Sequence, residues 1–348
     1  MTAHPSRRSL LTLAAGSALV APICCRARGE ARTVYVNSYG GVWETSWRKA
    51  FFDPFTAQTG IVIKTVPGVS FAKLKAQVQT RNYEWDVVNL GDVEYEQAAL
   101  EGLLERVDRS AAKADALPPP TVREYGVTSY SLGTNLVYRK DRFPNGGPRS
   151  WADFWDVKKF PGPRCMYDHS FTCLAFALLA DGVPADKLYP MDIDRAFRKM
   201  SELKPHIKVW WREGSQSQQL IRDGEVDMMS IWNARASELR EQGVPVELVW
   251  DGAVRSTSTW CVLRGAPNRK LAWELINFAS QAKPQAQFNT RLYYGPIHPG
   301  AYAFIARDIA VQLPTYPDNI AVSIKEDDAW EADRIAQIEE RFTAWLAS

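Results

Sequence analysis

The chain has 348 residues, of which 46% are apolar and 24% are charged, and its mean hydropathy is −0.29. This composition excludes a disordered chain, a collagen-like chain and a protein with several membrane spans. The formal charge is +2, but the first 31 residues contain four arginines and one glutamate, and the remainder has 38 basic and 39 acidic residues. A nearly neutral remainder gives no electrostatic reason to expect nucleic acid or an anionic membrane as a partner.

The N-terminus has the features of an export signal. Arg7 and Arg8 precede a short apolar run, residues 10–20, which is shorter than the roughly 20 residues that a membrane-spanning helix needs. A basic segment, a short apolar segment and small residues predict a signal that is cleaved near residues 27–31. The adjacent arginines favour the twin-arginine route, with an ordinary secretory signal as the alternative. We therefore expect residues 1–31 to be an export signal and the protein to be periplasmic.

Beyond this signal, the residue pattern alternates between strands and helices. The predicted strands are 33–37, 61–66, 85–90, 206–211, 227–232 and 246–250, and the predicted helices are 43–55, 70–80, 94–102, 171–180, 192–204, 216–223, 234–242, 271–280, 284–292 and 327–346. Strand-like passages around 130–138 and 257–264 join the two halves. This alternation indicates an α/β fold with a mostly parallel sheet covered by helices.

The first predicted helix carries an aromatic residue at every fourth position. These residues are Trp43, Trp47, Phe51 and Phe55. Such a stripe is one face of an amphipathic helix, and we expect it to pack on the core.

Three cysteines follow the signal, Cys165, Cys173 and Cys261. An exported protein can form one disulfide among them and leave one thiol, and three small buried side chains are the alternative. The chain beyond the signal has no Cys-x-x-Cys pair and its histidines are scattered, so we expect no metal site and no cofactor.

Sequence motifs of catalysis are also missing. Nucleophilic catalysis needs a serine or cysteine beside a base and an orienting acid. The chain has no Gly-x-Ser-x-Gly, no His-Glu-x-x-His and no glycine-rich phosphate motif. We therefore expect no enzyme, and a periplasmic enzyme remains a rival class.

Several short sequence motifs resemble those of the periplasmic solute-binding proteins of ABC importers, in particular of the group that binds spermidine and putrescine. Among these motifs are Phe-Thr-Ala-Gln-Thr-Gly-Ile at 55–61, Trp-Asp-Val-Val at 85–88, Ser-Trp-Ala-Asp at 150–153, Ile-Trp-Asn at 231–233 and Ala-Trp-Glu-Leu-Ile-Asn-Phe at 272–278. They follow the family's order over nearly the whole chain beyond the signal. The resemblance implies a type II periplasmic binding protein fold, in which two α/β lobes enclose a ligand cleft and close on the ligand.

The same resemblance implies how the chain is divided and what it does. Residues 32–134 and about 257–310 would form lobe 1, and residues 135–256 and about 311–348 would form lobe 2. The protein would capture a small amine-containing solute in the periplasm for an ABC importer, with the permease subunits as its partners. A binding protein that delivers its ligand to a sensor kinase remains the alternative.

The family's cleft positions fall on residues near predicted strand ends and lobe crossings. They are Ser38, Tyr39, Asp92, Asp168, Trp232, Trp260 and Tyr294. Polyamine binders need aromatic walls for methylene groups and carboxylates for ammonium groups, and Asp168 and Trp232 match the family's aspartate and tryptophan. Two of the family's carboxylates are replaced here, one of them by Phe171.

Two arginines of the second half add a feature that a polyamine site does not need. Arg212 and Arg235 follow predicted strands, and a guanidinium group pairs well with a carboxylate. One anionic and one cationic subsite favour an amino-carboxylate, such as a four-carbon amino acid, over a diamine. The alternatives are a surface position for Arg212, an ion pair for Arg235 and a helix N-cap for Asp168.

Overall fold

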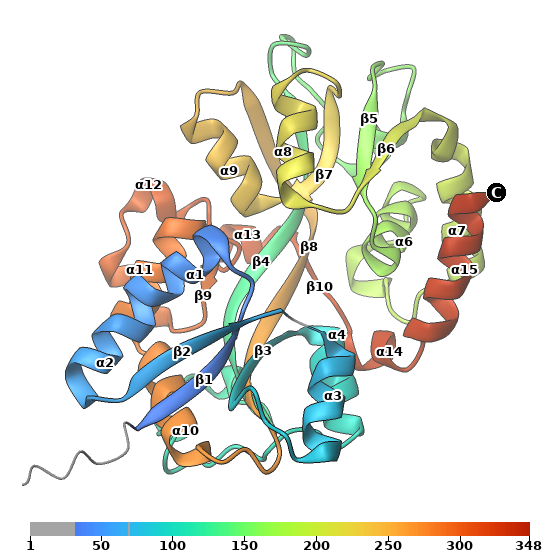
Figure 1. Ribbon diagram of the computed structural model, residues 1–348. Coiled ribbons are helices and arrows are strands. Elements are labelled where there is room, and N and C mark those ends of the chain that lie inside the picture. Colours follow the sequence, from blue (N-terminus) through green and yellow to red (C-terminus); the bar gives the residue numbers. More distant parts are fainter. Residues whose placement is uncertain (1–31, 69) are drawn as a thin grey trace, which may run out of the picture. The chain divides into compact units, whose positions relative to one another are not determined.

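The computed structural model describes residues 32–68 and 70–348 (Figure 1). The predicted export signal, residues 1–31, lies outside the described residues. The described strands form one mixed sheet in the order β2-β1-β3-β8-β4-β7-β5-β6. In the described part of the chain, no helix is both long and apolar enough to cross a membrane.

Two parallel groups of short strands lie at opposite ends of this sheet. The first group consists of β1 (Thr33–Ser38), β2 (Val62–Pro67) and β3 (Val87–Gly91). The second group consists of β5 (Arg164–Tyr167), β6 (Ile207–Trp211) and β7 (Met228–Trp232). Buried parallel strands are expected to be mainly apolar, as in Met228–Trp232, where Ser230 is the one polar residue. The prediction of a mostly parallel α/β arrangement is confirmed within each group.

Two long antiparallel strands, β4 (Gly126–Arg139) and β8 (Val246–Val262), run between the two groups. β8 pairs with β3, and β4 pairs with β7. The predicted strand 246–250 and the predicted passage 257–264 therefore belong largely to one strand. It continues through Gly252, whose φ of 67° is a conformation that favours glycine. The short strands β9 (Gly295–Pro296) and β10 (Ile324–Lys325) pair with β4 and β8.

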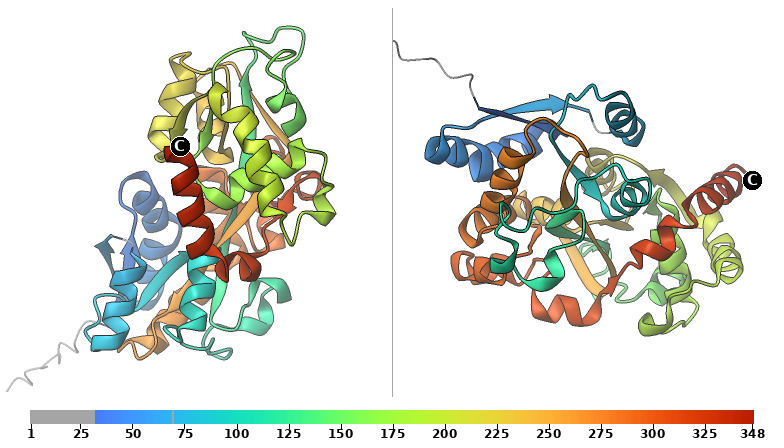
Figure 2. Two further views of the ribbon diagram at one scale, coloured as in Figure 1. Left: turned by 90° about the vertical axis from the view of Figure 1, so that its right-hand side faces the viewer. Right: turned by 90° about the horizontal axis from the view of Figure 1, so that it is seen from below.

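Helices cover the sheet (Figure 2). The longer ones are α1 (Gly41–Trp47), α2 (Asp53–Thr59), α3 (Phe71–Thr80), α4 (Asp92–Leu100), α6 (Ser170–Ala180), α7 (Ile193–Leu203), α8 (Gly214–Arg222), α9 (Asn233–Glu241), α10 (Arg269–Ala279), α11 (Ala282–Leu292) and α15 (Ile335–Ala347). Shorter ones are α5 (Trp151–Trp155), η6 (Pro299–Phe304), α12 (Arg307–Ala310), α13 (Pro317–Val322) and α14 (Asp328–Ala332).

Two predicted helices are interrupted. A π turn, η1 (Arg48–Phe52), separates α1 from α2 within the predicted helix 43–55. Pro54 follows this turn, and in a regular α-helix its ring would clash with the carbonyl of Ala50, so a wider turn relieves the clash. The predicted final helix 327–346 is divided into α14 and α15.

Apolar side chains gather in separate clusters beside the two strand groups. One cluster contains β1, β2 and β3 with α1, α2 and α10, and two others contain the second strand group with α6, α7, α8 and α9. Trp47, Phe51 and Phe55 are buried in the first cluster, as the stripe predicts, whereas Trp43 is only half-buried. The lobe boundaries near residues 134 and 256 stay a prediction.

The three cysteines of the described chain are buried and free. Burial raises the pKa of the thiols of Cys165, Cys173 and Cys261. The alternative of three small buried side chains therefore describes this structure, and no disulfide joins these residues.

Asp86, just before β3, joins three segments that are distant in the sequence. Its side chain is buried, and its carboxylate accepts hydrogen bonds from the backbone N–H of Tyr35 in β1 (2.9 Å) and of Asn268 before α10 (3.1 Å). Asp86→Ala would leave these buried donors unpaired, and we expect a loss of about 2–4 kcal/mol in the free energy of unfolding, measured by urea denaturation.

Asp115→Ala serves as the control, because Asp115 pairs with Arg109 on the surface and its side chain is 85% exposed. This control should change stability by no more than about 0.5 kcal/mol. Equal losses in the two variants would contradict the role given to Asp86.

Candidate ligand-binding site

A pocket of about 620 Å³, named here the cleft pocket, lies where the parallel strands of both groups end. Tyr39 and Asp92 follow the last residues of β1 and β3, and Tyr167 and Trp232 are the last residues of β5 and β7. In open α/β sheets, ligands bind at the carboxyl ends of the strands. The location of the cleft pocket is therefore that of a small-molecule site.

The loop between β1 and α1 carries Tyr39 into the cleft pocket. Gly40 and Gly41 have φ values of 72° and 56°, which glycine adopts without strain. Ser38 is buried beneath this loop, where its hydroxyl donates to Glu44 (2.6 Å) and accepts from the N–H of Gly40 (3.0 Å). Ser38 therefore stabilises the loop and does not line the pocket.

Aromatic rings line two sides of the cleft pocket. Trp43, Tyr130 and Tyr294 form one group, in which the ring of Tyr130 lies 5.2 Å from that of Trp43 and 4.9 Å from that of Tyr294. Tyr167 and Trp232 form the other, with ring centroids 5.3 Å apart. Such faces offer apolar surface for methylene groups and attract cations.

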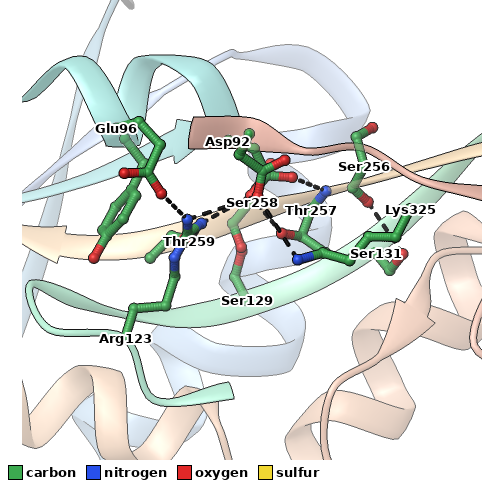
Figure 3. Close-up of polar contacts among 12 residues, drawn as sticks. Asp92, Glu96, Arg123, Ser129, Ser131, Ser256, Thr257, Ser258, Thr259 and Lys325 are labelled. Atoms are coloured by element: carbon green, nitrogen blue, oxygen red, sulfur yellow. Dashed lines mark hydrogen bonds and ion pairs between the residues drawn. The ribbon is translucent and has the colours of Figure 1, made fainter. Parts of the chain in front are cut away.

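Asp92, the first residue of α4, is buried and held by three donors (Figure 3). Its Oδ1 accepts from the guanidinium of Arg123 (2.9 Å) and from the hydroxyl of Thr257 (2.6 Å), and its Oδ2 accepts from the backbone N–H of Thr257. Because Arg123 offsets its charge and these donors use its acceptor sites, Asp92 contributes less to a cation subsite than its position in the pocket suggests.

Glu94, two residues further along α4, also lines the cleft pocket. Its carboxylate folds over Gly91, where an added Cβ would lie 2.6 Å from Oε2. The Glu94 side chain is accessible from the pocket, but protein on its other sides removes much of the surrounding water. This loss of water is the largest cause that raises the pKa of its carboxyl, and the negative charge of Asp92 adds to it. No lysine or arginine of the described residues forms an ion pair with Glu94, so it is an acid that lacks a protein counter-ion.

Arg235 lies in the first turn of α9 and is the only arginine or lysine among the described residues that line the cleft pocket. Its Nη1 forms an ion pair with Glu238 on the same helix (3.4 Å), as its alternative states, and donates to Gln218 (3.3 Å), and both contacts are long. Gly214 leaves room for it, because a Cβ there would lie 2.7 Å from Nε of Arg235. A guanidinium with long contacts of this kind can still receive a ligand carboxylate.

Five of the residues predicted for the site line the cleft pocket. They are Tyr39, Asp92, Trp232, Arg235 and Tyr294. The remaining four, Ser38, Asp168, Arg212 and Trp260, do not line it.

Asp168 and Arg212 are brought together outside the cleft pocket, where they form an ion pair with each other. Tyr167 and His169 both line the pocket, but the chain bends at Asp168, where the N–H of His169 donates to the carbonyl of Tyr167 (2.9 Å). This tight turn directs the Asp168 side chain to Arg212. Arg212 is exposed, with 77% of its side-chain surface accessible, as its surface alternative states. The N-cap of α6 is His169, so Asp168 does not cap that helix either.

Trp260 is buried in the core of the first strand group. Only 2% of its surface is exposed, and its ring lies 4.4 Å from that of Trp47. Its place in the site is therefore corrected to packing, whereas its neighbour Ser258 on β8 lines the cleft pocket.

Several lining residues were missed from the sequence. They are Glu94, Tyr130, Tyr167, Glu326 and Glu339. Tyr167 ends a strand and Glu94 lies three residues after one, so the rule that ligands bind at strand ends would have found both. Glu326 and Glu339 come from the C-terminal segment, which no local signal connects to the pocket.

An acid cluster adjoins the cleft pocket. Carboxylate oxygens of Asp92, Glu326 and Asp328 lie within 4.8 Å of one another. They are close enough to hold a cation, but Arg123 and Lys325 already approach Asp92 and Asp328, at 2.9 Å and 3.8 Å. The geometry is thus that of an acid cluster with counter-ions from the protein.

Burial is the main cause that raises the pKa values of Glu326, Asp328 and the nearby Glu331, and repulsion from neighbouring acids adds to it. The pKa of Asp328 rises to about 7 and that of Glu331 to about 8, and that of Glu326 also rises. Acids with raised pKa values bind protons in the folded state that the unfolded chain has already released, so stability falls as pH rises between the two pKa values.

We therefore expect the free energy of unfolding to decrease from about pH 5 to about pH 8, measured by urea denaturation. Glu331→Gln keeps the acceptor for the hydroxyl of Tyr189 and removes the titration, and it should reduce that decrease by at least about 1 kcal/mol. Glu340→Gln, on the exposed side of α15, is the control and should leave the slope unchanged. A pH slope that is the same in wild type and Glu331→Gln would contradict this assignment.

Known proteins share this architecture. The chain is 35% identical to the gamma-aminobutyric acid-binding protein of Pseudomonas aeruginosa, with 98% of this chain and 96% of that protein covered. It is 22% identical to the spermidine/putrescine-binding periplasmic protein of Escherichia coli, with 84% and 85% covered. The crystal structure of an ABC transporter substrate-binding protein from Bradyrhizobium japonicum superimposes with a TM-score of 0.86, at 36% identity over 90% of this chain and 99% of that chain.

This structural likeness confirms the fold class that the sequence motifs imply, a type II periplasmic binding protein fold. The family model for bacterial extracellular solute-binding proteins matches residues 50–317, most of the chain. The protein belongs to the family of bacterial extracellular solute-binding proteins.

Proposed function

We propose that the protein captures a short ω-amino acid, of the size and charge pattern of gamma-aminobutyric acid, in the cleft pocket and delivers it to the permease of an ABC importer. The observation that carries this proposal is the pair of opposite charges in one aromatic pocket. Glu94 offers a carboxylate without a protein cation, and Arg235 is the one cationic side chain among the described lining residues.

The ammonium end of such a ligand suits Glu94. A primary ammonium that leaves water needs a carboxylate, because an unpaired buried charge costs several kcal/mol. Asp92 is already paired with Arg123, so Glu94 is the carboxylate of α4 that can pair with the ammonium group. Trp43 and Tyr39 line the same side of the pocket and can cover the ammonium with their ring faces.

The carboxylate end suits Arg235. Its planar fork can bind two carboxylate oxygens at once, and its present contacts of 3.3 Å and 3.4 Å are long for charge-assisted hydrogen bonds. Tyr294 lies close to Arg235: burial raises the pKa of the Tyr294 hydroxyl, and the positive charge of Arg235 opposes this rise. A chain of a few methylene groups between the two ends would lie against Trp232 and Tyr294.

A polyamine is the second candidate, and the additional acids Glu326 and Glu339 in the lining favour it. A diamine would place an ammonium group near the guanidinium of Arg235, however, and like charges in a closed cleft repel strongly. The relative with the higher identity is also the one named for gamma-aminobutyric acid. These two points support the ω-amino acid over the polyamine.

In this proposal the protein binds and releases its ligand unchanged and uses no cofactor. The name of the superimposed structure, an ABC transporter substrate-binding protein, supports delivery to an importer over delivery to a sensor kinase. Closure of the two lobes over the cleft pocket would remove the ligand from water, and the importer would recognise the closed form.

Ligand binding tests this proposal directly. By calorimetry, we expect wild-type protein to bind gamma-aminobutyric acid more tightly than putrescine. Arg235→Gln should weaken binding of gamma-aminobutyric acid by about 10-fold or more and leave putrescine binding equal or stronger, because only the amino acid uses the guanidinium. Glu94→Gln should weaken both ligands.

Arg240→Gln is the matched control, because Arg240 lies on the same helix, is exposed and does not line the cleft pocket. Tighter binding of putrescine than of gamma-aminobutyric acid by wild-type protein would favour the polyamine. Unchanged affinity for gamma-aminobutyric acid in both pocket variants would reject this placement of the ligand.

We propose further that export uses the twin-arginine route, on the basis of the arginine pair before the apolar run. Replacement of both Arg7 and Arg8 by lysine should abolish export, measured as the mature protein in the periplasmic fraction. An ordinary secretory signal tolerates this change, since lysine keeps the positive charge. Unimpaired export of the double variant would therefore reject the twin-arginine route.

A further inference from the structure

A second pocket, named here the back pocket, has a volume of about 790 Å³ and lies against β4, β8 and β10. Its other walls come from η6, α12, α13 and the segments beside them. Along β8, Ser256 and Ser258 line the cleft pocket, whereas Arg255 lines the back pocket. Since successive side chains of a strand point to opposite faces, the two pockets lie on opposite faces of β8, and Thr257 borders both.

The charged residues that line the back pocket are all cationic. They are Arg123, Arg255, Arg307 and Lys325, and no aspartate or glutamate is among the described lining residues. Arg123 and Lys325 are already paired with carboxylates, at 2.9 Å from Asp92 and 3.8 Å from Asp328, and Figure 3 shows them on the two sides of Thr257. The other two cationic residues, Arg255 and Arg307, therefore determine the net charge of the back pocket.

Arg255 and Arg307 form no ion pair with any carboxylate of residues 32–68 and 70–348. The Nε of Arg255 donates to the hydroxyl of Ser323 (2.6 Å). Burial lowers the pKa of Arg255, and no acid nearby opposes this shift. Arg307, at the first position of α12, is exposed. A partly buried guanidinium without a counter-ion is costly, and an anion from solution would supply what the protein lacks.

The rest of the back pocket is largely apolar. Tyr302, Ile305, Tyr316, Pro317 and Ile320 contribute to its walls. The hydroxyl of Tyr302 is already hydrogen-bonded to Thr315 (2.9 Å), so this ring offers mainly its apolar face. Small-molecule sites combine such walls with a few polar groups that fix the orientation of the ligand.

We propose that the back pocket binds a small organic anion, a carboxylate with an apolar or aromatic body, whose charge pairs with Arg255 and Arg307. The carboxylate replaces the missing counter-ion, and the apolar body packs between Tyr302 and Ile320. This site is separate from the cleft pocket and does not depend on the ligand proposed there.

Calorimetry with 4-phenylbutyrate on the full mature protein tests the site. Two companions separate its features: 4-phenylbutan-1-ol has the same body without the charge, and inorganic phosphate has charge without the body. Titrations are run in the Arg235→Gln background as well as in wild type, so that entry of the probe into the cleft pocket is recognised. This comparison also keeps the result independent of whether gamma-aminobutyric acid binds.

We expect saturable binding of 4-phenylbutyrate in both backgrounds, and binding of the alcohol and of phosphate that is weaker by about 10-fold. Arg307→Gln, at an exposed position that the fold does not need, should weaken 4-phenylbutyrate by about 5-fold or more, and Arg255→Gln should do the same. Arg222→Gln, an exposed arginine on α8 outside the pocket, is the control and should leave binding unchanged.

Three results would overturn the proposal. One is the absence of saturable binding at millimolar 4-phenylbutyrate, and another is equal affinity in wild type and Arg307→Gln. The third is binding of phosphate as tight as that of 4-phenylbutyrate, which would show that the apolar walls do not contribute.

Discussion

The buried carboxylate of Asp92 is the interaction on which both pockets depend. It begins α4 directly after β3, and it holds the backbone and the hydroxyl of Thr257 in β8. On the side of the back pocket it pairs with Arg123, whose guanidinium stacks 3.8 Å from the ring centre of Tyr95. Loss of Asp92 would leave a partly buried arginine with less compensation and free two donors of β8, so its effect would reach both faces of the strand.

The two pockets lie on opposite faces of β8, and different elements supply their charges. Side chains of β8 point in turn to the cleft pocket and to the back pocket, and the acids Glu94 and Glu326 face the first while Arg255 faces the second. The strand between them keeps these charges apart. An amine and an organic anion would thus be attracted to different faces of the same strand, without competing for one site.

The fold could be predicted from the sequence because its signals are local. Strands such as Met228–Trp232 are mainly apolar, and the aromatic stripe of the first helix identifies its buried face, although Pro54 interrupts that helix. Pocket-lining residues directly at strand ends were predictable for the same reason. Tyr39, Asp92 and Trp232 each end or follow a parallel strand, and all three line the cleft pocket.

The errors arise where direction or distant packing decides. Asp168 follows a strand too, but a tight turn, closed by the N–H of His169 and the carbonyl of Tyr167, directs its side chain to Arg212 and not into the pocket. Trp260 was predicted for the site because it matches a cleft position of the family, yet its ring packs against that of Trp47. Glu326 reaches the pocket only because the C-terminal segment returns to β8 through β10, a long-range contact that no local pattern encodes.

The protonation of Glu94 is coupled to the binding of the ligand that we propose for the cleft pocket. Enclosure raises the pKa of its carboxyl and so opposes ionisation. An ammonium group beside it favours the ionised form, so ligand capture releases a proton wherever Glu94 was protonated before. Arg235 stays charged throughout, since a guanidinium keeps its proton in proteins. A zwitterion therefore provides an ammonium group for Glu94, which can change its charge, and a carboxylate for Arg235, which cannot. A diamine provides a partner for Glu94 only.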